Sequence, residues 1–248
     1  MSDQSSPIDF RSILGTAGAV GALNVAVGAG LGVGLLRGNR RLGNALALSL
    51  GHAAFLAAAG VRLNVVGEQN LWVHRPSVFV MNHQSGLDAM IVGALLRHDF
   101  SGLAKQEAQF SPVTFLLGKA VDAVFVDRAD SSKGRRAQEQ LVGRLREGLS
   151  VFVAPEGTRS DDGDLGEFRT GAFHVARTAG VPIVPIVLRN AYELMPGKAK
   201  FIRPGVVDVA VLEPIATDGW TVATVHDDVT AVRKLFVETL ANWPAGSR

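Results

Sequence analysis

The chain of 248 residues contains no cysteine. Disulfides, thiolate nucleophiles and cysteine metal sites are therefore excluded, and the redox compartment of the protein cannot be inferred. The chain also lacks a large excess of either charge, because 25 lysine and arginine residues against 23 aspartate and glutamate residues give a formal net charge of +2. This balance is too small to indicate a nucleic-acid partner.

Several common catalytic motifs are absent from the sequence as well. It contains no Gly-x-Ser-x-Gly nucleophile motif, no His-Glu-x-x-His zinc motif, and no glycine-rich dinucleotide or P-loop pattern. In the acidic segment 161–164, the glycine and the distal glutamate are misplaced for an EF-hand. We expect five of the six histidines to be structural or at the surface, namely His52, His74, His98, His174 and His226.

Apolar residues are abundant, at 47% of the chain, and two long apolar runs lie near the N-terminus. Residues 12–36 carry no charge and are rich in glycine, and residues 42–61 form a second run. In lipid the backbone must satisfy its own hydrogen bonds, which favours helix despite the glycines. We therefore expect residues 1–61 to hold a polar tail and a pair of apolar, membrane-associating helices. The acidic start and the length of the first run argue against a signal peptide.

Three arginines between the two runs limit how these helices can meet a membrane. Two full spans would leave Arg37, Arg40 and Arg41 outside the cell, against the positive-inside rule. Either the helices form a hairpin in the inner leaflet with the arginines at lipid phosphates, or the first run crosses and the second lies in the interface. Two buried core helices are the remaining alternative.

Residues 62–248 have the pattern of an α/β domain, with a mixed, largely parallel sheet covered by helices. A strand with Pro182 and Pro185 suits a sheet edge or a strand start. The apolar patterns predict strands over 61–67, 77–81, 103–105, 121–126, 151–153, 181–187 and 201–212. They predict helices over 89–96, 106–119 (interrupted at Pro112), 133–149, 168–178 and 225–240.

The segment Asn82–Asp88 carries the clearest chemical signal. It joins an apolar strand to an apolar helix, and it contains His83 and, five positions later, Asp88. A carboxylate that accepts a hydrogen bond from one imidazole nitrogen leaves the other nitrogen basic, so the pair can deprotonate a hydroxyl. The alternative is a capped turn, with Asn82 or Ser85 as N-cap and Asp88 complementing the helix dipole.

Charged residues follow other predicted strands too, and the carboxyl ends of strands are where sites gather in open α/β sheets. Backbone N–H groups around Gly157 could bind an oxyanion or a hydroxyl. Glu156 could bond to a hydroxyl or hold Arg159 in place. Structural ion pairs and turns are the alternative for each residue. The cations that could together hold a phosphate are Lys105, Arg128, Arg159 and Arg169.

Four blocks, in this order and spacing, resemble the glycerolipid acyltransferase family, specifically the 1-acylglycerol-3-phosphate acyltransferases. The blocks are residues 82–88, 125–128, 155–160 (continued by Phe168 and Gly171) and 181–186. The Pro-Glu-Gly-Thr-Arg-Ser block at 155–160 is the most diagnostic of them. Ala154 departs from the family pattern, which has an aromatic residue there, and this difference bears on pocket shape or lipid choice.

The resemblance implies a reaction without a metal or cofactor. His83, oriented by Asp88, would deprotonate the free hydroxyl of a lysophosphatidate, which then attacks an acyl-CoA or acyl carrier protein thioester to give phosphatidate. The glycerol phosphate would be held by Lys105, Arg128, Glu156, Gly157, Thr158 and Arg159.

The resemblance also implies partners and a location. The partners would be membrane lipids, lysophosphatidate and the acyl donor, with no nucleic acid. The protein would lie at the inner or cytoplasmic membrane, with its catalytic domain facing the cytoplasm. Alternatives are an acyltransferase for glycerol 3-phosphate, another lysophospholipid or a glycolipid, a non-catalytic lipid-binding protein of the same fold, and a lipid hydrolase.

Overall fold

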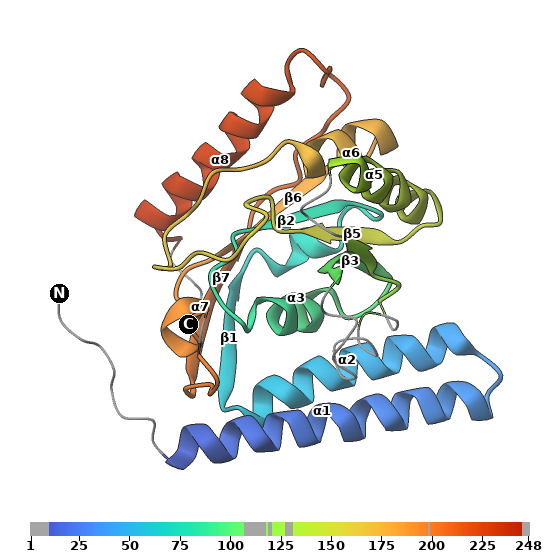
Figure 1. The fold of residues 1–248 in the computed structure, drawn as a ribbon, viewed down its shortest axis with the longest axis vertical. Helices are drawn as coiled ribbons and strands as arrows, with labels where there is room; N and C mark the ends of the chain where they lie inside the picture. Colours follow the sequence, from blue (N-terminus) through green and yellow to red (C-terminus); the bar gives the residue numbers. More distant parts are fainter. Residues whose placement is uncertain (1–9, 107–117, 119–120, 127–130, 198, 245–248) are drawn as a thin grey trace.

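The structure, a computed structural model, describes residues 10–106, 118, 121–126, 131–197 and 199–244, with the backbone alone at Lys105 and at residues 131–133. Helices lie on both faces of a central sheet, and a long helical hairpin forms one outer layer (Figure 1). The predicted α/β class is confirmed. Two short helices were not predicted, η1 (Glu68–Leu71) and α7 (Ala191–Leu194).

Seven strands of the described chain form one sheet in the order β1-β7-β6-β2-β5-β3-β4. Only β6 and β7 pair antiparallel, and the other neighbours pair parallel. The mixed, largely parallel sheet is therefore as expected. The strands are β1 (Val61–Val66), β2 (Val78–Met81), β3 (Phe100–Lys105), β4 (Val124–Val126), β5 (Ser150–Val153), β6 (Ile183–Leu188) and β7 (Gly205–Val211).

The central strands are buried on both faces, which explains their unbroken apolar sequence. In β2, Phe79 and Met81 face the core beneath α2 (Arg40–Ala58) and α3 (Asp88–Leu96). Val78 and Val80 face the opposite core, beneath α5 (Ser131–Arg146), α6 (Gly171–Ala179) and α8 (Val225–Ala241). Both layers thus pack on β2, the strand that leads into the His83 turn.

The hairpin pairs α1 (Phe10–Leu36) with α2 through small residues. A Cβ on Gly30 would collide with the backbone nitrogen of Ala47, and a Cβ on Gly34 would lie 2.6 Å from the Cα of Gly43. The glycines of the first apolar run therefore allow the two helix backbones to approach each other. Figure 1 shows the two helices lying side by side along the edge of the domain.

The outer face of α1 is apolar and exposed, so α1 is not a buried core helix. It is also the one helix, among the described residues, that is long and apolar enough to cross a membrane. Leu48 and Leu56 of α2, however, belong to the same core cluster as the sheet. The hairpin and the sheet therefore share a core. The predicted domain boundary between residues 61 and 62 is not tested by this packing and stays a prediction. Exposed apolar residues of α1 include Phe10, Leu14, Val25, Leu35 and Leu36.

Of the two alternatives for the strand with Pro182 and Pro185, the structure excludes the sheet edge, because β6 lies between β7 and β2. Pro182 precedes the strand, as the strand-start alternative allows. The carbonyl of Pro185 accepts from the N–H of Leu212 at 2.9 Å, one residue past the end of β7. Pro185 is tolerated because the bond that it cannot return to Leu212 falls at the end of the β6–β7 ladder, which pairs residues 186–188 with residues 209–211. The predicted helix over 106–119 falls almost wholly outside the described residues.

Candidate active site

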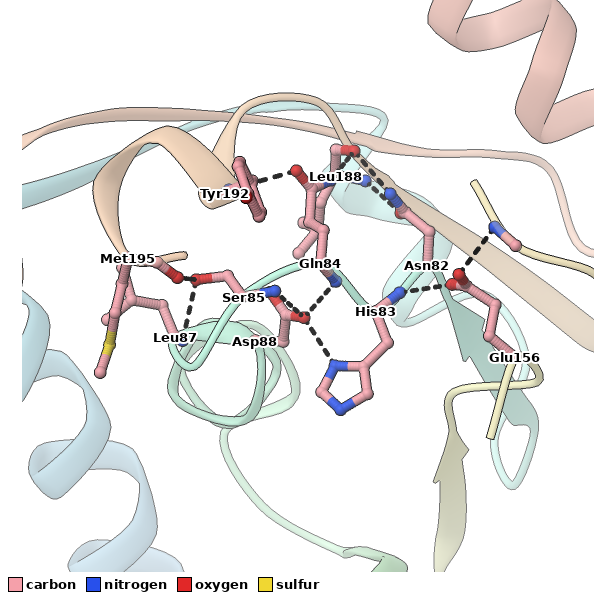
Figure 2. A network of polar contacts seen from close by, with 11 residues as sticks. Asn82, His83, Gln84, Ser85, Leu87, Asp88, Glu156, Leu188, Tyr192 and Met195 are labelled. Carbon is pink, nitrogen blue, oxygen red and sulfur yellow. Dashed lines mark hydrogen bonds and ion pairs between the residues drawn. The ribbon is translucent and has the colours of Figure 1, made fainter. Parts of the chain in front are cut away.

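The turn between β2 and α3 is fixed by side-chain hydrogen bonds to the ends of other elements (Figure 2). Asn82 Nδ2 donates to the carbonyl of Leu188 and Asn82 Oδ1 accepts from its N–H, each at 2.8 Å. Gln84 Nε2 donates to the same carbonyl at 2.7 Å, and Ser85 Oγ donates to the carbonyl of Met195 at 2.8 Å. These side chains bond the turn to the last residue of β6 and to the residue after α7, so the turn is held before any ligand binds.

His83 and Asp88 are in direct contact within this turn, with His83 Nδ1 2.7 Å from Asp88 Oδ2. The same oxygen accepts from the backbone N–H groups of Gln84 and Ser85, at 2.8 and 2.9 Å. Because the carboxylate accepts, Nδ1 carries the hydrogen and Nε2 keeps its lone pair. The Asp88 side chain is 1% exposed and that of His83 is 25% exposed. One carboxylate therefore caps the turn and also orients an accessible basic nitrogen.

Glu156 holds the backbone of His83 from the turn after β5. Its Oε1 accepts from the N–H of His83 at 2.6 Å, and its Oε2 accepts from the N–H of Gly166 at 2.9 Å. The carbonyl of His83 accepts from the N–H of Ser160 at 2.8 Å. Glu156 is buried, which raises the pKa of its carboxyl, while the two amide donors act in the opposite direction.

Two exposed arginines approach this centre from either side. A Cβ on Gly86 would lie 3.6 Å from Nη1 of Arg159, and a Cβ on Gly157 would lie 3.0 Å from Nε of Arg169. Gly157 has a φ of +76°, in the left-handed region that favours glycine. A side chain at position 157 would therefore be strained in its backbone and would press on the guanidinium group of Arg169.

Two cavities meet at His83. One of about 380 Å³ lies against α2, α3 and β3, and its lining includes Met90, Phe100, Leu103 and Arg159. The other, of about 470 Å³, lies against α5, α6 and β5, and its lining includes Leu141, Val153 and Arg169. Since His83 lines both, its imidazole can meet reactants that approach from two directions.

The structure brings some of the predicted site residues together and leaves others undescribed. Thr158 and Arg159 line an open groove beside Glu156 and Arg169. Lys105 is the last residue of β3, but its side chain lies outside the description, and Arg128 lies outside the described residues altogether.

His52 is structural, as one of the two alternatives for it predicted, but its place in the cavity wall was not predicted. His52 is buried, it lines the 380 Å³ cavity, and its Nδ1 donates to the carbonyl of Leu48 at 2.7 Å. The available signal was its spacing of four residues from both Leu48 and Leu56, which places all three on the domain side of α2.

Comparisons with known proteins agree with this architecture. Residues 62–189 match the sequence profile of the acyltransferase family. Human 1-acyl-sn-glycerol-3-phosphate acyltransferase beta is 40% identical over 167 residues, covering 67% of this chain and 60% of that protein. The mouse alpha enzyme is 34% identical over 189 residues, covering 75% of this chain and 64% of that protein. This chain therefore spans less than two thirds of the length of either relative.

A solved structure is similar over almost the whole chain. The 1-acyl-sn-glycerophosphate acyltransferase from Thermotoga maritima aligns with a TM-score of 0.79 and 25% sequence identity, covering 95% of this chain and 98% of that one. The similarity therefore includes the helical hairpin as well as the sheet.

Proposed function

The chain belongs to the acyltransferase family, and we propose that it is a 1-acylglycerol-3-phosphate O-acyltransferase of phospholipid biosynthesis. It would move a fatty acyl group from acyl-CoA or acyl carrier protein to the free sn-2 hydroxyl of a lysophosphatidate. The observation that carries the proposal is the His83–Asp88 pair, joined at 2.7 Å where two cavities meet. The names of the relatives point to the same acceptor.

The proposed mechanism uses His83 as general base and then as general acid. Nε2 takes the proton of the acceptor hydroxyl as its oxygen attacks the thioester carbonyl carbon. The tetrahedral oxyanion collapses, the carbon–sulfur bond breaks, and the thiolate takes the proton back from the imidazolium. The buried Asp88 carboxylate stabilises that imidazolium. The acyl thioester is a co-substrate, and the proposal involves no metal or prosthetic group.

The phosphate of the acceptor is proposed to lie against Arg159, at the groove that also contains Thr158. A guanidinium group offers two parallel donors to a phosphate. The family resemblance predicts that the glycerol phosphate is also held by Lys105, Arg128, Glu156 and Gly157. The apolar walls of the cavities suit the hydrocarbon chains.

We further propose that the hairpin lies in the cytoplasmic leaflet without crossing it, with the catalytic domain facing the cytoplasm. Packing of α1 along α2, together with the contact of α2 with the sheet core, supports this arrangement over a single spanning α1. The exposed apolar face of α1 would then meet lipid, and Arg37, Arg40 and Arg41 at the hairpin turn would meet phosphates.

The direct test is an assay of the purified full-length protein in mixed micelles. With lysophosphatidate and either acyl-CoA or acyl carrier protein thioester, we expect phosphatidate of the matching mass and one free thiol per product. Glycerol 3-phosphate and other lysophospholipids serve as competing acceptors. Thiol release without an acceptor, or transfer only to another acceptor, would replace the proposed activity by hydrolysis or by a different transfer.

Replacing Arg159 by alanine should raise the KM for lysophosphatidate about 10- to 100-fold, with kcat less affected. The reason is that a charge-assisted hydrogen bond contributes about 1.5–3 kcal/mol to binding. The control is Arg146→Ala, an exposed arginine in the last turn of α5. An unchanged KM in Arg159→Ala would remove this residue from the phosphate site.

A further inference from the structure

A partly exposed tryptophan lies beside two guanidinium groups near the C-terminal end of α3. Trp72 is 37% exposed and the next residue, Val73, is 57% exposed. The guanidinium carbon of Arg75 lies 4.3 Å from the centroid of the indole ring, and that of Arg97 lies 5.4 Å from it. The indole is therefore partly exposed beside two cations, of which Arg97 also pairs with Glu68 at 2.9 Å.

The segment that carries Trp72 is firmly attached to the domain. Arg75 donates to the carbonyls of Leu71, Leu96 and His98, at 3.0, 3.2 and 2.9 Å. Burial lowers the pKa of Arg75 to about 10, so the guanidinium remains charged at neutral pH. Arg75 thereby joins the segment after η1 to the C-terminal end of α3.

This patch continues directly onto the flank of α2. Ser49 Oγ donates to the carbonyl of Arg97 at 3.1 Å, and Arg41 Nη2 lies 2.8 Å from Asp99 Oδ1. The residue after Ser49 is Leu50, which is 52% exposed on the outer face of α2. These contacts bring α2, with the 74% exposed side chain of Arg41, beside the segment of Arg97 and Asp99, and Arg97 in turn lies beside the indole.

We infer that Trp72 and Val73, with Arg41 and Arg97, form a second contact with the phospholipid interface beside the hairpin. The inference rests on the proposed membrane association and extends it to the catalytic domain. Tryptophan favours the depth of lipid headgroups, where its ring is partly in hydrocarbon, and arginine binds phosphates there. The hairpin alone would leave the domain free to roll about the hairpin axis. A second contact fixes that rotation, and hence the direction in which the cavities at His83 open.

Tryptophan fluorescence tests the inference, because the chain contains three tryptophans. Trp220 and Trp243 pack against the core on the opposite face of the sheet, and Trp220 stacks on Phe173 at 6.0 Å. One full-length variant retains only Trp72 (Trp220→Phe with Trp243→Phe), and the matched control retains only Trp220 (Trp72→Phe with Trp243→Phe). Each is mixed with phosphatidylcholine–phosphatidylglycerol vesicles whose acyl chains carry bromine near the headgroup.

We expect the emission of Trp72 to shift to the blue and to be quenched by the brominated lipid, and that of Trp220 to be unaffected. If the protein sediments with vesicles while Trp72 stays unquenched, the second contact is wrong and the hairpin anchor stands. If neither variant sediments with vesicles, the proposed membrane association fails together with this inference.

A second variant measures what the contact contributes. Val73→Asp places a charge at an exposed position and should weaken vesicle affinity several-fold. Val222→Asp is the control, since Val222 is 65% exposed in the segment before α8. Circular dichroism and thermal unfolding confirm that each variant is folded. Equal vesicle affinity in both variants would contradict the inference.

Discussion

Replacement of His83 by alanine should lower kcat by about two to four orders of magnitude, the usual effect of losing a general base. Asp88→Asn should act in the same direction, because an amide can still accept from Nδ1 but carries no charge to stabilise the imidazolium. Turnover is measured with both substrates saturating, so that weakened binding does not contribute.

The control for these variants is His226→Ala, which removes an exposed histidine of α8 on the opposite layer of the domain. It should retain full activity. A His83→Ala protein that folds normally and keeps more than about a tenth of the wild-type kcat would reject His83 as the base, because general-base loss costs far more.

Replacement of Glu156 by glutamine should lower both kcat and the temperature of unfolding. Both carboxylate oxygens accept from backbone N–H groups, of His83 at 2.6 Å and Gly166 at 2.9 Å. A glutamine has one acceptor oxygen, so one of these partly buried N–H groups would face an NH₂ group and lose its partner. An unsatisfied buried donor costs about 1–3 kcal/mol, which lowers the unfolding temperature by several degrees in a chain of this size.

This experiment separates two roles of Glu156. If it positions His83, kcat and stability fall together while the KM for lysophosphatidate changes little. If it binds the acceptor, as the family resemblance implies, KM rises and stability does not fall. Glu167→Gln is the matched control, because Glu167 is close in sequence, its side chain is 89% exposed, and it pairs with Arg233 at 3.2 Å.

Several features of the fold follow from short stretches of sequence. Apolar strands and apolar helical patterns alternate along residues 62–241, and this alone predicts a largely parallel sheet covered by helices. The His83–Asp88 contact is equally local, since the two residues are five positions apart and α3 begins at Asp88.

The position of β6 in the sheet shows what such reasoning cannot decide. Two prolines indicate a strand that lacks donors, but they do not say which neighbour lies beside each nitrogen. Pro185 is accommodated in a central strand because it lies opposite Leu212, at the end of the β6–β7 ladder, where only one bond is missing. The order of strands in the sheet, which decides this, depends on contacts between distant segments.

The sequence by itself determined the fold class, the two apolar N-terminal helices and the imidazole–carboxylate pair, because each depends on spacing within one turn or one periodic segment. Only the tertiary structure decided that the carboxylate of Glu156 bonds to the backbone of a residue 73 positions away, and that the hairpin shares a core with the sheet. Glu156 and Arg159 are both charged residues of one turn. Which of them lies buried against His83 and which is exposed is set by the packing of β5 beside β2, which no local pattern encodes.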